Sequence, residues 1–178
     1  PFSQFYGQTT PFFPSYMREL VDQQLLLASA TTETGVGGDL RQSKCAVEVI
    51  GDSFTLEKHA PVISYGIEAD AVLATCRRAP DAAPSDQVHV VVKREDMDLE
   101  EISSWDTLGF RGTCSLGFVL RGKGRKEQIL PAPFADILAQ SMHPFSHMVW
   151  GSLWLGLAID AVDRARASVG AAGRQGPD

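Results

Sequence analysis

The chain has 178 residues, of which 44% are hydrophobic and 21% are charged, and its net charge is −6 at pH 7. This composition fits an ordinary soluble globular protein, and the acidic balance excludes a general affinity for nucleic acid or for an anionic membrane. The three cysteines, Cys45, Cys76 and Cys114, are widely spaced and include no Cys-x-x-Cys pair. They argue against a disulfide framework and a zinc site, and they favour buried thiols in a reducing cytoplasm.

The first segment, residues 1–14, is rich in proline and aromatic residues, so we expect turns there. It lacks the basic and then apolar pattern of a signal peptide, and it begins without methionine, which suggests a fragment or a processed chain. Pro14 suits the first turn of a helix, and helix formers follow over residues 15–24.

Short strands are predicted from residue 25 to about residue 120. A Gly51-Asp52 turn between two alternating runs predicts a hairpin over 46–58. The chain contains no helical pattern between these strands, which favours an antiparallel barrel or sandwich. The other predicted strands cover 25–30, 61–65, 71–76, 87–92 and 113–120.

After Pro131 the pattern becomes helical, with a short helix or linker over 134–142 and one long helix over 144–172. The first half of the long helix is apolar nearly all round, so it must be buried on most sides. The rest of the sequence offers nothing to cover it. We therefore expect either further helices outside this chain or partner chains, and an isolated chain that is oligomeric or poorly soluble. Its apolar run, residues 148–159, is too short to span a bilayer.

The stretch Ser29–Asp39 follows an apolar run and carries three threonines, two acids and three glycines. Glycines allow a positive φ and a close approach to a ligand, and successive free N–H groups form an anion-binding concavity. The stretch is therefore either a cradle for a ligand with a polar ring and phosphates or a plain glycine turn.

Other candidate groups carry weaker signals. The basic clusters Arg77-Arg78 and 121–126 are either phosphate contacts or solvated loop charges. Glu33 is either a general base or a tie that holds its loop through backbone N–H groups. His143 and His147 share a helical spacing, but Pro144 lies between them and no acid lies nearby, so no metal site is predicted. The chain has no recognised hydrolase, metalloprotease or nucleotide-binding motif.

Three motifs occur in an order that resembles the middle domain of the acyl-CoA dehydrogenases. They are residues 32–39, residues 61–66 leading to 69–71, and the most specific one, Trp105 to Ser115. Residues 150–169, with a Trp-Leu-Gly-Leu-Ala core, resemble the first long helix of that family's C-terminal bundle.

The resemblance implies an α+β fold in which an antiparallel Greek-key β-barrel is flanked by helices. It divides the chain into the end of an N-terminal helical domain (1–24), the middle β-barrel domain (25–130) and the truncated start of a C-terminal bundle (131–178). It also implies FAD as the cofactor, held between the barrel and the bundle.

The same resemblance implies site residues, which include Gly38 as a substrate contact and Ser64 as a donor to flavin N5. The sequence departs from the family pattern at Val62, where an aromatic residue commonly stacks on the flavin, and at Gly38, where a serine is usual. The family's catalytic base, a glutamate in the bundle, has no counterpart here, so no catalytic residue is assigned. The cofactor-binding residues implied are Ser29, Thr31, Thr32, Gly37, Gly38, Val62, Ile63 and Ser64.

The implied activity is α,β-dehydrogenation of an acyl-CoA thioester by an FAD-dependent oxidoreductase, with an electron-transfer acceptor as partner. The chain is expected to be cytoplasmic, to form a homo- or hetero-oligomer, and to have no membrane span and no nucleic-acid partner. Two alternatives remain open: a flavin-dependent monooxygenase or oxidase on the same scaffold, and a non-catalytic subunit of a heteromeric assembly.

Overall fold

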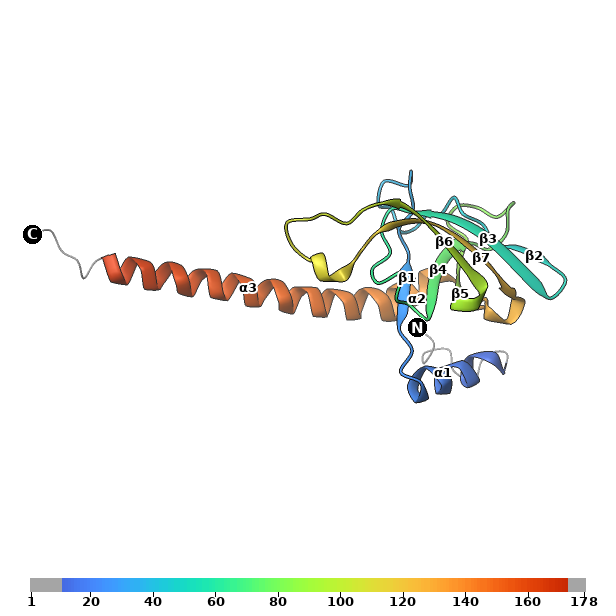
Figure 1. Cartoon of the computed structure of the whole chain (residues 1–178), viewed down its shortest axis with the longest axis horizontal. Helices are drawn as coiled ribbons and strands as arrows, with labels where there is room; N and C mark the ends of the chain where they lie inside the picture. The colour runs from blue at the N-terminus through green and yellow to red at the C-terminus, as the bar shows by residue number, and fades with distance from the viewer. Residues whose placement is uncertain (1–10, 173–178) are drawn as a thin grey trace, which may run out of the picture. The chain divides into compact units, whose positions relative to one another are not determined.

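The computed structural model describes residues 11–172, with side chains up to residue 170, and it divides between Ile137 and Leu138 into two compact units (Figure 1). The expected turns in residues 1–10 and the expected weak structure beyond residue 172 lie outside the described residues. The predicted domain boundaries at 24 and 130 stay predictions.

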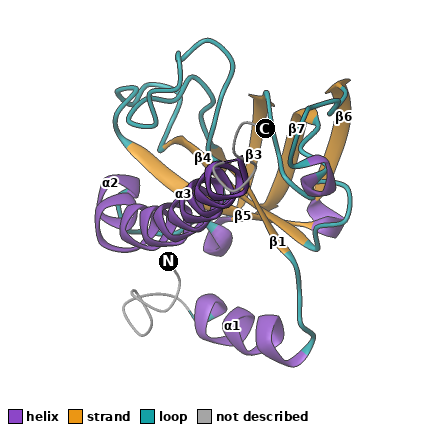
Figure 2. Ribbon diagram, turned by 90° about the vertical axis from the view of Figure 1, so that its left-hand side faces the viewer, coloured by secondary structure: helices purple, strands orange, loops and turns teal. Residues whose placement is uncertain are grey.

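The first unit contains helix α1, seven strands and the short helix α2 (Figure 2). Helix α1 corresponds to the helix predicted over residues 15–24 and begins three residues earlier. The strand Met97–Ser103 was not predicted. The elements are α1 Phe12–Asp22, β1 Leu27–Ala30, β2 Glu48–Ile50, β3 Ser53–Ala60, β4 Ala71–Arg77, β5 Gln87–Lys93, β6 Met97–Ser103, β7 Gly117–Arg125 and α2 Phe134–Ile137.

The strands form two sheets, an antiparallel one in the order β2-β3-β7-β6 and a smaller one in the order β1-β4-β5. The predicted hairpin is present, because β2 pairs antiparallel with β3 across Gly51. The predicted α+β class is confirmed, but the strands do not form one closed antiparallel barrel, since β1 runs parallel to β4. Asp70 explains this direction: its carboxylate accepts from Leu26 N at 2.8 Å and its own N–H donates to Leu26 O at 2.9 Å, so β1 and β4 start side by side.

The core lies between the two sheets. Alternate residues of β3 point inward, as the strict exposed–buried alternation of this strand shows. Strand β5 is buried on both faces, and on the face away from β3 the ring of Phe134 in α2 lies 4.7 Å from the ring of His89. Gly122 of β7 allows close packing, because a Cβ there would lie 2.9 Å from Val92 Cγ1 of β5. The buried apolar residues of this cluster include Ala28, Ala30, Val47, Phe54, Leu56, Val72, Ala74, Val88, Val90, Val92, Phe118 and Leu120.

Helix α1 is held to the first unit by aromatic and ionic contacts. Lys93, at the end of β5, has its ammonium 5.2 Å from the centre of the Tyr16 ring and 3.6 Å from Glu19 Oε2. These contacts attach α1 beside the end of β5.

The second unit contains a π-helical turn, Leu138–Met142, and the helix α3, His143–Ala172. The predicted long helix is therefore present, but its apolar side chains are exposed rather than buried; Trp154 is 55% exposed and Leu155 61%. By length and composition alone, the helical stretch Phe134–Gly170 reaches the hydropathy of a membrane span, with a mean of 1.2 over 18 residues. The core helix of a soluble protein meets the same criterion, so this finding carries little weight by itself.

Candidate functional site

The glycine loop after β1 is anchored by a buried glutamate. Glu33 is 8% exposed and its carboxylate accepts hydrogen bonds from Ser43 Oγ at 2.6 Å and from Cys45 N at 2.6 Å. It also accepts from Lys44 N and from Lys58 Nζ, each at 3.1 Å. All of its oxygen sites are used, so the structure favours the tie over the general base among the two roles considered for Glu33.

Lys58 is the charged partner that makes this burial possible. Its side chain is fully buried on the inward face of β3, where its ammonium also donates to Thr75 O at 2.8 Å. Burial by itself would raise the pKa of Glu33, but the hydrogen bond from Ser43 and the charge of Lys58 outweigh it and hold the pKa below its usual range. The Glu33 carboxyl therefore stays ionised, and its contact with Lys58 joins the loop to the interior of the sheets.

A second buried polar side chain lies beside this pair. His89 of β5 contacts Thr75 Oγ1 through Nε2 at 2.9 Å, and among the described residues its Nδ1 has no hydrogen-bond partner. Burial, with the charge of Lys58 adding to it, lowers the pKa of His89 to about 3, so the ring is neutral at physiological pH.

The glycines of the loop leave an open backbone. Gly37 and Gly38 have φ of 63° and 81°, and a Cβ at either would meet nothing within 4 Å. Within residues 11–172, neither N–H donates a hydrogen bond. Two consecutive free N–H groups beside open space are what an anion or another acceptor needs. Asp39, which closes the loop, is neutralised by Arg41 at 2.9 Å, and this hydrogen bond lowers the pKa of Asp39 to about 2.

The predicted hydroxyl groups lie at the end of β1. Ser29 is exposed, and its Oγ lies 2.7 Å from Thr31 Oγ1. Thr32 is half-buried. These side chains therefore stand at the entrance to the glycine loop, Ser29 on β1 and the two threonines directly after it.

The structure brings the three sequence motifs together. Thr34 N donates to His59 O at 2.9 Å, which places the glycine loop against the end of β3, directly before residues 61–66. Ile63 N donates to Leu116 O and Tyr65 N to Thr113 O, each at 2.9 Å, which joins the second motif to the third. The three motifs, far apart in sequence, thus form one continuous region of the first unit.

Residues 61–65 form a turn rather than the predicted strand, because Pro61 has no N–H to donate and Tyr65 has a φ of 57°. Val62 is half-buried, and the side chain of Ile63 is fully buried in the core, so only its backbone can face a ligand. Ser64 is exposed, and its Oγ lies 2.8 Å from Ser115 Oγ.

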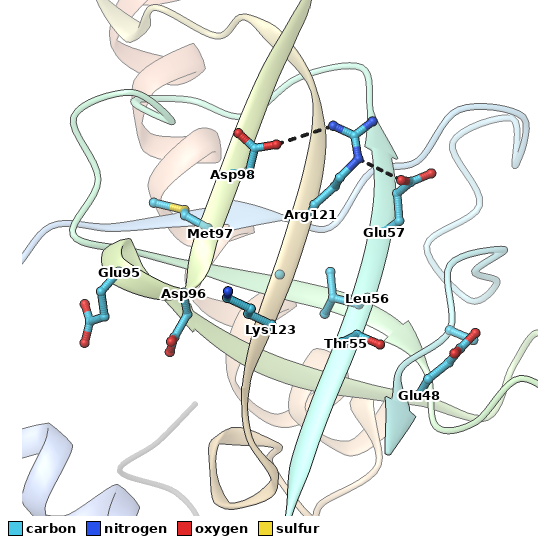
Figure 3. A pocket seen from close by; sticks show the side chains of 12 residues that line it. Glu48, Thr55, Leu56, Glu57, Glu95, Asp96, Met97, Asp98, Arg121 and Lys123 are labelled. Atoms are coloured by element: carbon cyan, nitrogen blue, oxygen red, sulfur yellow. Dashed lines mark hydrogen bonds and ion pairs between the residues drawn. The ribbon is translucent and has the colours of Figure 1, made fainter. Parts of the chain in front are cut away.

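A groove of about 590 Å³ lies elsewhere, on the exposed face of the four-stranded sheet (Figure 3). Arg121 stands between two carboxylates there, 2.9 Å from Glu57 and 3.4 Å from Asp98, and it also pairs with Glu100 at 2.8 Å. No residue of the predicted site lines this groove. Its acidic side chains form a solvated ionic surface.

The basic clusters are largely paired. Arg78 contacts Asp86 at 3.0 Å, Arg125 contacts Glu127 at 3.0 Å, and Arg77 donates to the carbonyl groups of neighbouring loops. These contacts favour solvated loop charges over phosphate contacts. In the part of the chain that the structure describes, no three His, Cys, Asp or Glu side chains gather to hold a metal.

Comparison with solved structures identifies the fold. A probable acyl-CoA dehydrogenase from Mycobacterium abscessus matches 74% of this chain with a TM-score of 0.60 and 20% identity, over 36% of its own length. An acyl-CoA dehydrogenase from Geobacillus kaustophilus matches 75% of this chain at 0.61 and 23%, over 36% of its length. The chain has the fold of part of an acyl-CoA dehydrogenase.

A third structure, a glutaryl-CoA dehydrogenase from Mycobacterium smegmatis in complex with FADH2, matches 74% of this chain at a TM-score of 0.56 and 16% identity, over 34% of its length. The chain thus spans about a third of the length of the structures that it matches. No family profile and no curated protein matches the sequence. The likeness supports the resemblance drawn from the three motifs, and at these identities it concerns the fold alone.

Several residues that build this region were missed in the sequence. Lys58 ends the predicted hairpin and has no predicted role, although the alternation of β3 places it on the same face as Phe54 and Leu56. The hydrogen bonds between Ser64 and Ser115 and between Lys58 and Glu33 join residues that are 51 and 25 positions apart. No local sequence pattern predicts these contacts.

Proposed function

We propose that this chain is part of an FAD-dependent oxidoreductase of the acyl-CoA dehydrogenase type, which carries out α,β-dehydrogenation of an acyl-CoA thioester. The observation that carries the proposal is the continuous region formed by the three motifs. In it the buried Glu33–Lys58 pair holds the glycine loop with its two free N–H groups, and backbone hydrogen bonds hold the turn that carries Ser64. The fold likeness supports it.

The residues present fit a flavin nucleotide. The space beside Gly37 and Gly38 is open because neither residue has a side chain to fill it. An acceptor-rich group such as a phosphate can therefore reach the backbone N–H groups. Gly38 is also the proposed contact to substrate. The hydroxyls near the flavin ring would come from Ser29, Thr31 and Thr32. The second segment, the Val62–Ser64 turn, would contribute the Val62 side chain, the Ile63 backbone and the Ser64 hydroxyl.

When bound, FAD supplies the acceptor for the two electrons that leave the acyl chain as a hydride. The proposed role of Ser64 is a neutral hydrogen bond at flavin N5, which adds no charge beside the ring. The Glu33–Lys58 pair holds the loop in place, and the described residues include no assigned catalytic base. An electron-transfer acceptor, an oligomeric state and a cytoplasmic location belong to the same proposal.

The test begins with flavin itself. The purified chain is mixed with FAD and desalted, and the flavin absorbance that stays with the protein is measured. We expect Thr32→Val and Ser64→Ala each to lower the affinity for FAD, since a lost buried hydrogen bond costs about 1–3 kcal/mol when its partner stays unsatisfied. Val49→Thr, on an exposed strand of the other sheet, serves as the control and should leave the affinity unchanged. A chain that retains no FAD, or two site variants that bind FAD like the wild type, would refute the proposal.

The alternatives are separated by the reaction. Anaerobic bleaching of the flavin by an acyl-CoA, followed by electron transfer to an acceptor, is expected for a dehydrogenase. Rapid oxygen consumption or a hydroxylated product would instead indicate an oxidase or monooxygenase. A colourless protein under conditions that retain flavin would indicate a non-catalytic subunit.

A further inference from the structure

Three hydroxyl groups form a line that begins at the exposed Ser64, passes through the buried Ser115 and ends at the half-buried Thr113. Ser64 Oγ lies 2.8 Å from Ser115 Oγ, which lies 2.7 Å from Thr113 Oγ1. Thr113 Oγ1 in turn lies 2.8 Å from the carbonyl oxygen of Phe110. Ser115, in the middle, is 6% exposed, whereas Ser64 is open to solvent. The outer end of the line is therefore the end that a ligand can reach.

Each hydroxyl has one proton to donate, so the protons in the line are ordered. If Thr113 donates to the Phe110 carbonyl, Ser115 must donate to Thr113 and Ser64 to Ser115. Ser64 then offers only a lone pair to a ligand. In the reverse order Thr113 donates to Ser115 and Ser115 donates to Ser64. The Ser64 proton is then free to point at a ligand.

The reverse order leaves no acceptor unsatisfied at the Phe110 end of the line. The Phe110 carbonyl oxygen also accepts from Trp105 Nε1 at 2.9 Å and from Thr113 N at 3.1 Å. These two donors occupy its two lone pairs without the Thr113 hydroxyl. The same arrangement of heavy atoms therefore allows both proton orders.

We propose that Ser115 and Thr113 are positioning residues that allow Ser64 to be either a hydrogen-bond donor or a hydrogen-bond acceptor toward flavin N5. This inference rests on the proposed function, which places Ser64 beside N5. The oxidised ring has a lone pair at N5 and needs a donor, whereas the reduced ring carries an N–H and needs an acceptor. Rotation of the three hydroxyl protons meets both needs, and the line thereby supports the reduced as well as the oxidised cofactor.

The decisive variant is Ser115→Ala in the full 178-residue chain. Without Ser115, Ser64 can still donate to oxidised N5, but when it accepts from reduced N5–H its own proton has lost its acceptor in the line. We expect the affinity for oxidised FAD to stay within about twofold and the affinity for dithionite-reduced FAD to fall about tenfold, which equals about 30 mV for a two-electron couple. Anaerobic titrations with FAD in each redox state, together with the midpoint potential of the bound flavin, measure this ratio.

Three further variants test the assignment independently. Thr113→Val removes the inner hydroxyl and should shift the ratio in the same direction, whereas Thr113→Ser keeps the hydroxyl and should restore it. Cys114→Ser alters the exposed residue between the two positioning residues and should leave both affinities unchanged. Circular dichroism confirms that each variant is folded, and Thr113→Val decides the question if Ser115→Ala does not fold.

The outcomes separate this inference from the proposed function. If the wild-type chain binds no FAD, the proposed function fails and the inference fails with it. If Ser64→Ala weakens FAD binding but Ser115→Ala and Thr113→Val leave the ratio of affinities unchanged, the inference alone is overturned. An equal loss of affinity in both redox states would likewise overturn it, because it would show a purely structural role.

Discussion

Strand β5 and helix α3 are both rich in apolar residues, but their surroundings are opposite. Strand β5 is buried on both faces by the other sheet and by α2, whereas the side chains of α3 are exposed along almost its whole length. Burial of apolar side chains is therefore favourable in both elements, and the described residues bury only those of β5. The sheets should thus respond to substitution as a core, and α3 should respond as an interaction surface.

The largest effect is expected where the first unit buries charge. Lys58→Met leaves the Glu33 carboxylate buried without its cation and should lower the free energy of unfolding by about 3–5 kcal/mol. Chemical denaturation followed by circular dichroism measures the change. Arg121→Met is the matched control, because its ion pairs are exposed and each contributes at most about 1 kcal/mol. Equal losses in the two variants would contradict the assigned role of Lys58.

Acid should destabilise the same region in two steps. The folded pKa of His89 is about 3, below its value of about 6.5 in an unfolded chain, so the unfolded state binds one more proton between these values. Stability is therefore present above pH 6.5 and falls by about 1.4 kcal/mol per pH unit as the pH decreases through this window. Glu33, whose folded pKa is lowered, adds a further loss below about pH 4.3.

His89→Gln separates the two steps. The variant should lose the decline between pH 6.5 and about pH 4.3 and keep the decline below it, since the carboxyl groups with a lowered pKa, Glu33 and Asp39, still titrate there. Unfolding free energies measured from pH 8 to pH 3 give the two slopes. An unchanged slope above pH 4.5 in the variant would show that His89 is not the group that titrates.

A smaller effect is expected where the first unit is open to solvent. Gly38→Ala meets no atom within 4 Å but must adopt a φ of 81°, which costs about 1 kcal/mol for a residue with a Cβ. Gly109→Ala is the control, because that position is equally open and has no positive φ. Thermal unfolding should show a lower melting temperature for the first variant only.

The smallest effect on stability is expected in α3, despite its large apolar surface. The triple variant Leu153→Gln, Trp154→Gln and Leu157→Gln should change the unfolding free energy of the sheets by less than about 0.5 kcal/mol, because exposed positions carry little stability. Its self-association, measured by sedimentation velocity, should fall sharply relative to the wild type. Leu120→Gln, in the core, should show the reverse pattern. A wild-type chain that sediments as a stable monomer would break the comparison.

Local patterns in the sequence predict much of this structure. The alternation around Gly51-Asp52 gives the β2–β3 hairpin, and the apolar runs give β4 and β5. Strand β6 was missed because Met97–Ser103 carries three acids and lies at a sheet edge, where charged residues are tolerated. The parallel pairing of β1 with β4 could not be predicted, since it depends on Asp70 reaching Leu26 across 44 residues.

The candidate site was predictable in its positions but not in its connections. The glycine loop and Ser64 follow from composition and from motif order, yet their shared anchoring depends on side chains distant in sequence. Glu33 shows the difference: both of its possible roles were compatible with the sequence, and four hydrogen-bond donors converging on its carboxylate distinguish them.

The pairing of β3 with β7 has a consequence for how the protein is made. Strand β3 has its long neighbour β7 only after about 60 more residues have been synthesised. At about 5–20 residues per second, a nascent chain would hold the edge of β3 unpaired for about 3–12 seconds. During that interval the β2–β3 hairpin presents an open edge with Phe54 and Leu56 on its inward face. Early protection of this hairpin on the ribosome would therefore govern how much of the chain reaches the folded state.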